Sequence, residues 1–130
     1  MTALEIVTLA DRPNGGLNID TWHCARTGTT TAQLGAVPAD RLLAIQINDG
    51  PAVAEDDLVD ATLHHRLLPG EGDFDLTGCL RALSEAGSRA PLGVEVFSDE
   101  LHSRGPEEAA RLAGEAARRL LDAIGGEVAS

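Results

Sequence analysis

The chain has 130 residues, which suits a single ordinary domain, and 43% of them are hydrophobic, so we expect a packed core. Its net charge of -11 argues against nucleic-acid binding, which needs a basic surface. Cys24 and Cys79 form no CxxC pair, no basic segment opens the chain as in a signal peptide, and no apolar run is long enough to span a membrane. We therefore expect a reduced, cytoplasmic protein without a membrane segment.

The pattern of apolar residues predicts alternating helices and strands. A first helix is expected over residues 3–10, ending at the turn formed by residues 13–16, where glycine can take left-handed backbone angles. Strands are expected over residues 16–20, 41–48 and 92–97, a weak helix or single turn over 31–37, and longer helices over 74–87 and 106–125. Residues 49–73 are expected to form one long loop.

This order of elements is typical of a parallel α/β sheet with right-handed crossovers. Two architectures fit it, namely a small doubly wound sheet and part of a (β/α)8 barrel. The chain has no glycine-rich phosphate loop of the GxGxxG or GxxxxGK type, which disfavours a nucleotide-binding doubly wound fold.

Polar side chains lie at or near the carboxyl end of each predicted strand. The first strand ends at Asp20 and is followed by His23, the second contains Gln46, and the third contains Glu95 between two valines. The carboxyl ends of the strands form the active face in parallel α/β folds. Carboxylate and amide oxygens suit Mg²⁺ or Mn²⁺, and an added imidazole shifts the preference toward Mn²⁺, Co²⁺ or Zn²⁺.

Each of these residues also has a plainer explanation. Asp20 can cap the turn that follows it, His23 can be a hydrogen-bonded loop residue, and Gln46 can pair with a backbone group or a water. Glu95 is harder to explain in this way, because a carboxylate inside an apolar strand needs a cation or a proton. Arg66 precedes a proline–glycine turn and is expected to bind an anionic or polyhydroxylated substrate, with a solvated loop charge as the alternative.

Three segments resemble the C-terminal part of the xylose isomerase-like TIM barrels, the sugar phosphate isomerase and epimerase superfamily. They are "GLNIDTWH", "AIQIND" followed by "RLLPGEGDFDL", and "GVEVFSDE". The resemblance implies one domain over residues 1–130, a partial (β/α)8 barrel with roughly strands six to eight and their helices. The N-terminal half would be absent, because a closed barrel typically needs about 250 residues.

The resemblance also implies the roles of the polar residues. Asp20, Gln46 and Glu95 would bind one divalent metal ion, with Gln46 standing where most members have histidine. The ion would be Mn²⁺ or Mg²⁺, with Co²⁺ or Zn²⁺ as alternatives. Glu95 would also move the proton in catalysis, while His23 and Arg66 would bind the substrate. The family's fourth ligand, a glutamate on the fifth strand, has no counterpart in this chain.

Three functions follow from the resemblance. The first is a metal-dependent isomerase or epimerase of carbohydrate metabolism, which moves a proton next to the carbonyl of a small sugar, sugar phosphate or keto acid through an enediolate. The second is a dehydratase of the inosose or 3-dehydroshikimate type, and the third is a truncated half barrel without catalysis. Activity would require a complementary N-terminal half barrel or self-association, because three strands cannot close a barrel and leave exposed edges.

Overall fold

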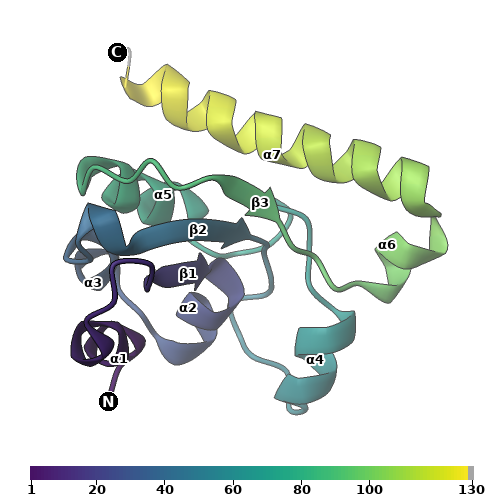
Figure 1. Ribbon diagram of the computed structural model, residues 1–130. Coiled ribbons are helices and arrows are strands. Elements are labelled where there is room, and N and C mark those ends of the chain that lie inside the picture. Colours follow the sequence, from purple (N-terminus) through teal and green to yellow (C-terminus); the bar gives the residue numbers. More distant parts are fainter. Residues whose placement is uncertain (129–130) are drawn as a thin grey trace.

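The computed structural model describes residues 1–128, which form a small sheet with helices packed mainly on one of its faces (Figure 1). The elements, in chain order, are α1 (Ala3–Ala10), β1 (Leu17–Asp20), α2 (Thr21–Thr27), α3 (Thr31–Gly35), a short 3-10 helix (Ala39–Arg41), β2 (Leu42–Ile47), α4 (Leu58–His64), α5 (Leu76–Glu85), β3 (Leu92–Val94), α6 (Asp99–Ser103) and α7 (Pro106–Val128). The predicted α/β class is confirmed, and the arrangement is consistent with a partial TIM barrel.

The three strands form a parallel sheet in the order β1-β2-β3. In its register Asp20 lies beside Gln46 on the neighbouring strand, and Gln46 in turn lies beside Gly93. Within residues 1–128, β1 and β3 each pair on one side only, so each has a free edge. Parallel strands in this order require crossovers, and the helices between the strands provide them.

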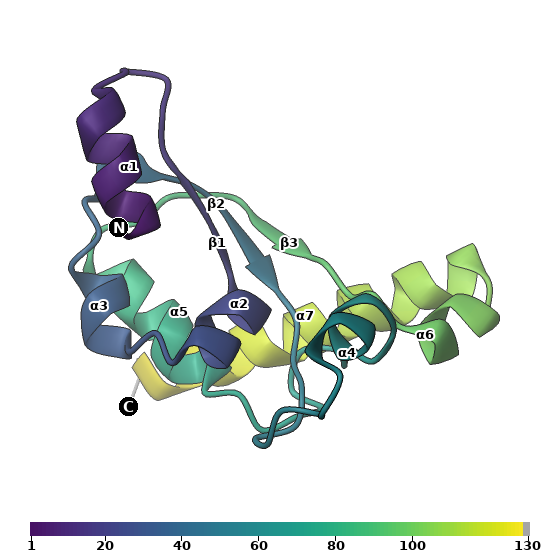
Figure 2. The ribbon, with the colours of Figure 1, turned by 90° about the horizontal axis from the view of Figure 1, so that it is seen from below.

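One face of the sheet packs against the helices that follow the strands, and Figure 2 shows α3, α5 and α7 on the same side of it. In α5, Leu76, Leu80 and Leu83 recur at the spacing of one helical face and are all buried, so this face packs against the core. The opposite face carries polar and small residues, of which Asn18 and Gly93 are exposed, Ala44 and Gln46 are half-buried and Asp20 is buried. Within residues 1–128, no helix is both long and apolar enough to span a lipid bilayer.

Several boundaries differ from the sequence prediction. The first helix ends at Asp11, whose φ of 42° makes it the left-handed residue, and not at a glycine. Three short helices, α2, α4 and α6, were not expected, and α4 lies inside the predicted long loop; side chains of Asp20, Asp57 and Ser98 cap their first turns. The third strand is shorter than expected, so that Glu95 lies one residue beyond it.

Candidate active site

The parallel register brings the predicted polar residues to one edge of the sheet. Asp20 ends β1, Gln46 lies beside it near the end of β2, and Glu95 follows β3 two residues after Gly93. Because side chains two residues apart in an extended chain point to the same face, these groups converge. The Nε2 atom of Gln46 donates a hydrogen bond of 2.7 Å to Oε1 of Glu95, which joins two of the three predicted ligands directly.

Asp20 both caps a helix and takes part in the polar cluster. Its Oδ1 atom accepts hydrogen bonds from the backbone N–H of Trp22 and from Nδ2 of Asn48, both at 2.9 Å. Its Oδ2 atom lies 3.2 Å from Nη1 of Arg66. The capping explanation is therefore confirmed for one carboxylate oxygen, while the other oxygen faces the site.

Arg66 is buried between the two carboxylates and is not a solvated loop charge. Its side chain is 3% exposed, and its Nη1 atom lies 3.2 Å from Oδ2 of Asp20 and 3.1 Å from Oε2 of Glu95. The guanidinium also donates through Nε to the backbone oxygen of Thr62 at 2.9 Å and stacks over the ring of Phe97 at 4.9 Å. This single buried positive charge reduces the electrostatic repulsion between the two carboxylates.

Gln46 is held on both sides. Its Oε1 atom accepts a hydrogen bond of 2.5 Å from Nδ2 of Asn18 on β1, while its Nε2 atom donates to Glu95. The half-buried amide of Gln46 therefore has a partner for its oxygen and for its nitrogen. Asn18 was not singled out in the sequence, although its position two residues before Asp20 places it on the same face of the strand.

Asn48 and Asp49, for which no role was predicted, support the site. Asn48 is fully buried and donates through Nδ2 to Asp20 and to the backbone oxygen of Glu95 at 3.1 Å. Asp49 is 1% exposed and accepts hydrogen bonds from the backbone N–H groups of residues 50, 70 and 74, at distances of 2.8 to 3.0 Å. The signal in the sequence was an uninterrupted polar pair at the end of an apolar strand.

His23 lies at the rim of the site, whereas His64 and His65 pair with acidic residues outside the predicted ligand set. His23, on the first turn of α2, has a side chain that is 64% exposed, and its Nε2 atom lies 3.7 Å from Oδ2 of Asp20. His64 contacts Asp99 at 3.0 Å, whereas His65 contacts Glu55 at 2.9 Å, so the neighbouring histidines turn to different partners. The hydrogen bond to the Glu55 carboxylate raises the pKa of His65 above its usual value.

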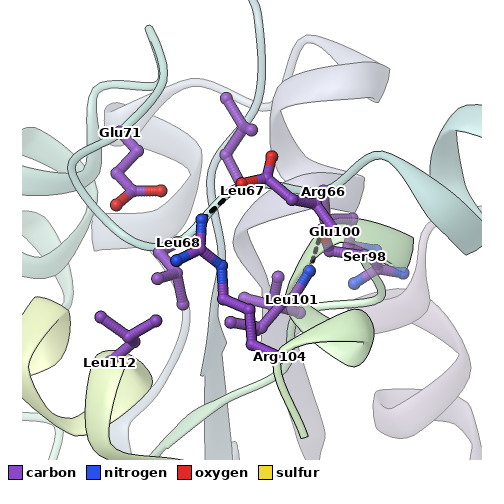
Figure 3. A pocket seen from close by; sticks show the side chains of 10 residues that line it. Arg66, Leu67, Leu68, Glu71, Ser98, Glu100, Leu101, Arg104 and Leu112 are labelled. Carbon is purple, nitrogen blue, oxygen red and sulfur yellow. Dashed lines mark hydrogen bonds and ion pairs between the residues drawn. The ribbon is translucent and has the colours of Figure 1, made fainter. Parts of the chain in front are cut away.

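A cavity of about 170 Å³ lies beside the cluster (Figure 3). Arg66 and Ser98 line it on the side of the site, and Glu71, Leu101 and Leu112 line it elsewhere. The Arg104 guanidinium in its wall forms an ion pair of 2.7 Å with Glu100, visible as a dashed line in Figure 3. None of the three predicted metal ligands lines this cavity, so it adjoins the strand ends and does not enclose them.

The chemistry of the donor set decides whether these residues suit a divalent cation. Among residues 1–128, no three histidine, cysteine or acidic side chains are grouped as a metal site would require. The cluster instead offers two carboxylates and one amide, all hard oxygen donors of the kind that Mg²⁺ and Mn²⁺ prefer. Arg66 already places a positive charge between the same carboxylates. The oxygen donors of Asp20, Gln46 and Glu95 are nevertheless of a kind that suits a divalent cation.

Comparisons with known proteins agree with the partial TIM-barrel fold. The model of the family "Xylose isomerase-like TIM barrel" matches residues 1–123. The chain is 34% identical over 97 residues to a 3-dehydroshikimate dehydratase of Pseudomonas aeruginosa, covering 75% of this chain and 15% of that protein. It is 32% identical over 111 residues to an inosose isomerase of Bacillus subtilis, covering 85% of this chain and 39% of that protein.

A solved structure described as the IOLI protein with a bound zinc atom has the same fold over most of this chain. The superposition has a TM-score of 0.83 at 28% identity, and it covers 94% of this chain but 43% of the other. The chain thus spans less than half the length of these relatives. The match over residues 1–123 shows that the chain belongs to the xylose isomerase-like TIM barrel family.

Proposed function

We propose that this chain supplies part of the active site of a divalent-metal-dependent isomerase or epimerase that acts on a small sugar or keto acid. One observation carries the proposal: two carboxylates from different strand ends meet around one buried cation, the Arg66 guanidinium. Burying Arg66 at this position costs desolvation energy that a purely structural sheet edge does not require. The similarity to inosose isomerases supports the same reaction class.

Asp20, Gln46 and Glu95 would hold the metal ion. When bound, the ion would stabilise negative charge that develops on the carbonyl oxygen of the substrate. The zinc atom in the related structure supports a divalent metal, and the oxygen donors of this chain favour Mg²⁺ or Mn²⁺, with Co²⁺ or Zn²⁺ as alternatives.

Glu95 is the residue that we propose to move the proton. Its side chain is 31% exposed, whereas that of Asp20 is 9% exposed, so a substrate can approach Glu95 more easily. The carboxylate would take a proton from the carbon beside the carbonyl group and return one to the neighbouring carbon. Arg66 and the exposed His23 would bind substrate oxygens and hold that carbon near Glu95.

The rest of the ligand set would come from outside this chain. A fourth ligand and a second base would belong to a complementary half barrel, which we propose pairs with the free edges of β1 and β3. This chain covers 39% of the inosose isomerase that it resembles. A second copy of the chain is the alternative partner.

A dehydratase is the second candidate, and the similarity to a 3-dehydroshikimate dehydratase favours it. Both reactions begin with removal of a proton beside a carbonyl, and a dehydratase then expels a neighbouring hydroxyl group as water. The same residues would serve both reactions up to the enediolate.

The test combines metal binding with two substrates. Calorimetric titration of the chain with Mn²⁺ measures binding, and deuterium exchange from solvent into inosose, followed by NMR, measures proton abstraction. Loss of water from 3-dehydroshikimate, followed by ultraviolet absorbance, measures dehydration. We expect Mn²⁺ binding, with turnover only when a complementary half barrel is present. Absence of Mn²⁺ binding would instead favour a half barrel without catalysis.

A further inference from the structure

Asn18 begins a row of hydrogen bonds that crosses all three strands. Its Nδ2 atom donates to Oε1 of Gln46 at 2.5 Å, and Nε2 of Gln46 donates to Oε1 of Glu95 at 2.7 Å. The side chain of Asn18 is exposed on β1 and does not pack in the core, so packing does not explain why this residue is an asparagine. Asn18 therefore supplies a hydrogen-bond partner for Gln46 at a position where the fold would also accept other residue types.

The direction of this row bears on metal binding. Only the oxygen of a glutamine amide can bind a hard cation, because the nitrogen is a hydrogen-bond donor. In the row as it stands, the Gln46 oxygen faces Asn18 and the nitrogen faces Glu95. Gln46 can therefore bind a cation together with Glu95 only after its amide has turned over.

Turning the amide places its oxygen beside Oε1 of Glu95, which is unfavourable unless a cation lies between them. The nitrogen then faces Asn18 and needs an acceptor there. Asparagine meets both requirements, because its amide carries a donor and an acceptor and can turn with Gln46. Gly93, the register neighbour of Gln46, leaves the space beside it open, because no atom lies within 4 Å of the position of a side-chain Cβ there.

We propose that Asn18 is a positioning residue that stabilises the Gln46 amide in two orientations. Without metal, Asn18 donates to the Gln46 oxygen; with a divalent cation bound, Asn18 accepts from the Gln46 nitrogen. The second orientation rests on the proposed metal-dependent function, whereas the first is independent of it. An aliphatic residue at position 18 would leave the Gln46 oxygen without its donor, and aspartate would favour the orientation that binds metal.

The first test is a double-mutant cycle on the full chain, with Mn²⁺ affinity measured by calorimetry. Asn18→Asp adds a negative charge that attracts Mn²⁺ by itself, so the same substitution is also made in the Gln46→Leu background. The effect that acts through Gln46 is the difference between the two backgrounds. We expect Asn18→Asp to tighten Mn²⁺ binding about fivefold more with Gln46 present than with leucine there. An equal effect in both backgrounds overturns the metal-bound orientation.

The second test follows the side-chain amides by NMR, with the diamagnetic ion Mg²⁺ in place of Mn²⁺. Without metal, we expect the Asn18 NH₂ protons to exchange with solvent more slowly in the wild type than in Gln46→Leu, because they donate to Gln46. Saturating Mg²⁺ should release these protons in the wild type and leave them unchanged in Gln46→Leu.

The outcomes separate the two proposals. If neither Mn²⁺ nor Mg²⁺ binds the wild-type chain, the metal-dependent function is refuted, together with the metal-bound orientation of Asn18. The exchange rates of the Asn18 NH₂ protons without metal then test the metal-free orientation, in which Asn18 donates to Gln46. Equal rates in the wild type and in Gln46→Leu overturn that orientation. If metal binds but the Asn18 protons do not respond to it, the positioning role is refuted while the metal site stands.

Discussion

Replacing Arg66 with methionine removes the buried cation while keeping much of the side-chain volume. Removing one partner of a buried ion pair costs about 3–5 kcal/mol, because the other charge stays buried without compensation. Asp20 keeps two donors, the backbone of Trp22 and the amide of Asn48, which limits the loss. Glu95, at 31% exposed, is partly solvated and adds little. We therefore expect Arg66→Met to lower the free energy of unfolding by about 3 kcal/mol.

Urea unfolding followed by tryptophan fluorescence measures this loss. Trp22 is the only tryptophan in the chain, is 1% exposed, and has its ring centroid 5.5 Å from Cζ of Arg66, so its emission reports on this region. A loss of about 3 kcal/mol shifts the urea midpoint down by about 1.5 M when the slope is about 2 kcal/mol per M. Arg111→Met is the matched control, because Arg111 also bridges two carboxylates, Glu108 and Glu115, but is 51% exposed.

The control should lose less than about 1 kcal/mol, as exposed ion pairs usually do. Equal losses for Arg66→Met and Arg111→Met would refute the reasoning, since they would mean that burial between the carboxylates adds nothing to the value of the Arg66 charge.

Three further predictions concern the neighbouring residues. Gln46→Leu should weaken Mn²⁺ binding about tenfold in calorimetry and change the urea midpoint little; unchanged affinity would remove Gln46 from the ligand set. Asp49→Ala should lower the free energy of unfolding by about 2–4 kcal/mol, because three backbone N–H groups lose a buried acceptor, whereas the exposed Asp56→Ala should have little effect; equal losses would contradict this. NMR titration should give His65 a pKa above 6.5, and Glu55→Gln should lower it. Because this pKa is raised, the pair stabilises the fold fully below pH 6.5 and loses its effect as the pH rises through the folded-state pKa; a pKa unaffected by Glu55→Gln would contradict the contact.

The parts of the fold that could be predicted are those with strong local patterns. The apolar run of β2 and the leucine stripe of α5 identify their elements without tertiary information. The grouping of Asp20, Gln46 and Glu95 also follows from the sequence, because parallel strands bring their carboxyl ends to one edge. The short helices α2, α4 and α6 have five to seven residues, too few for a clear period, and their formation depends on capping and tertiary contacts.

The contacts that complete the cluster could not be predicted, since they join residues far apart in the sequence. Arg66 reaches Asp20 across 46 positions, and its burial depends on how the loop after β2 folds back over the strand ends. The orientation of the Gln46 amide depends in the same way on Asn18, 28 positions earlier. A residue type can indicate that a side chain needs a partner, but only the fold decides which partner it meets.

The Asp49 carboxylate has a consequence for how this protein can change over evolutionary time. Its oxygens accept hydrogen bonds from the backbone N–H groups of Gly50 and Gly70, at the two ends of the long segment that follows β2. The backbone of Asp49 also pairs with that of Leu67, near the second end of this segment. Residues 50–70 therefore leave and rejoin the end of β2 at one closed base, and residues 52–60 within this excursion are all exposed. Insertions or replacements in that segment should alter what passes over the strand ends while the positions of Asp20, Gln46 and Glu95 stay the same.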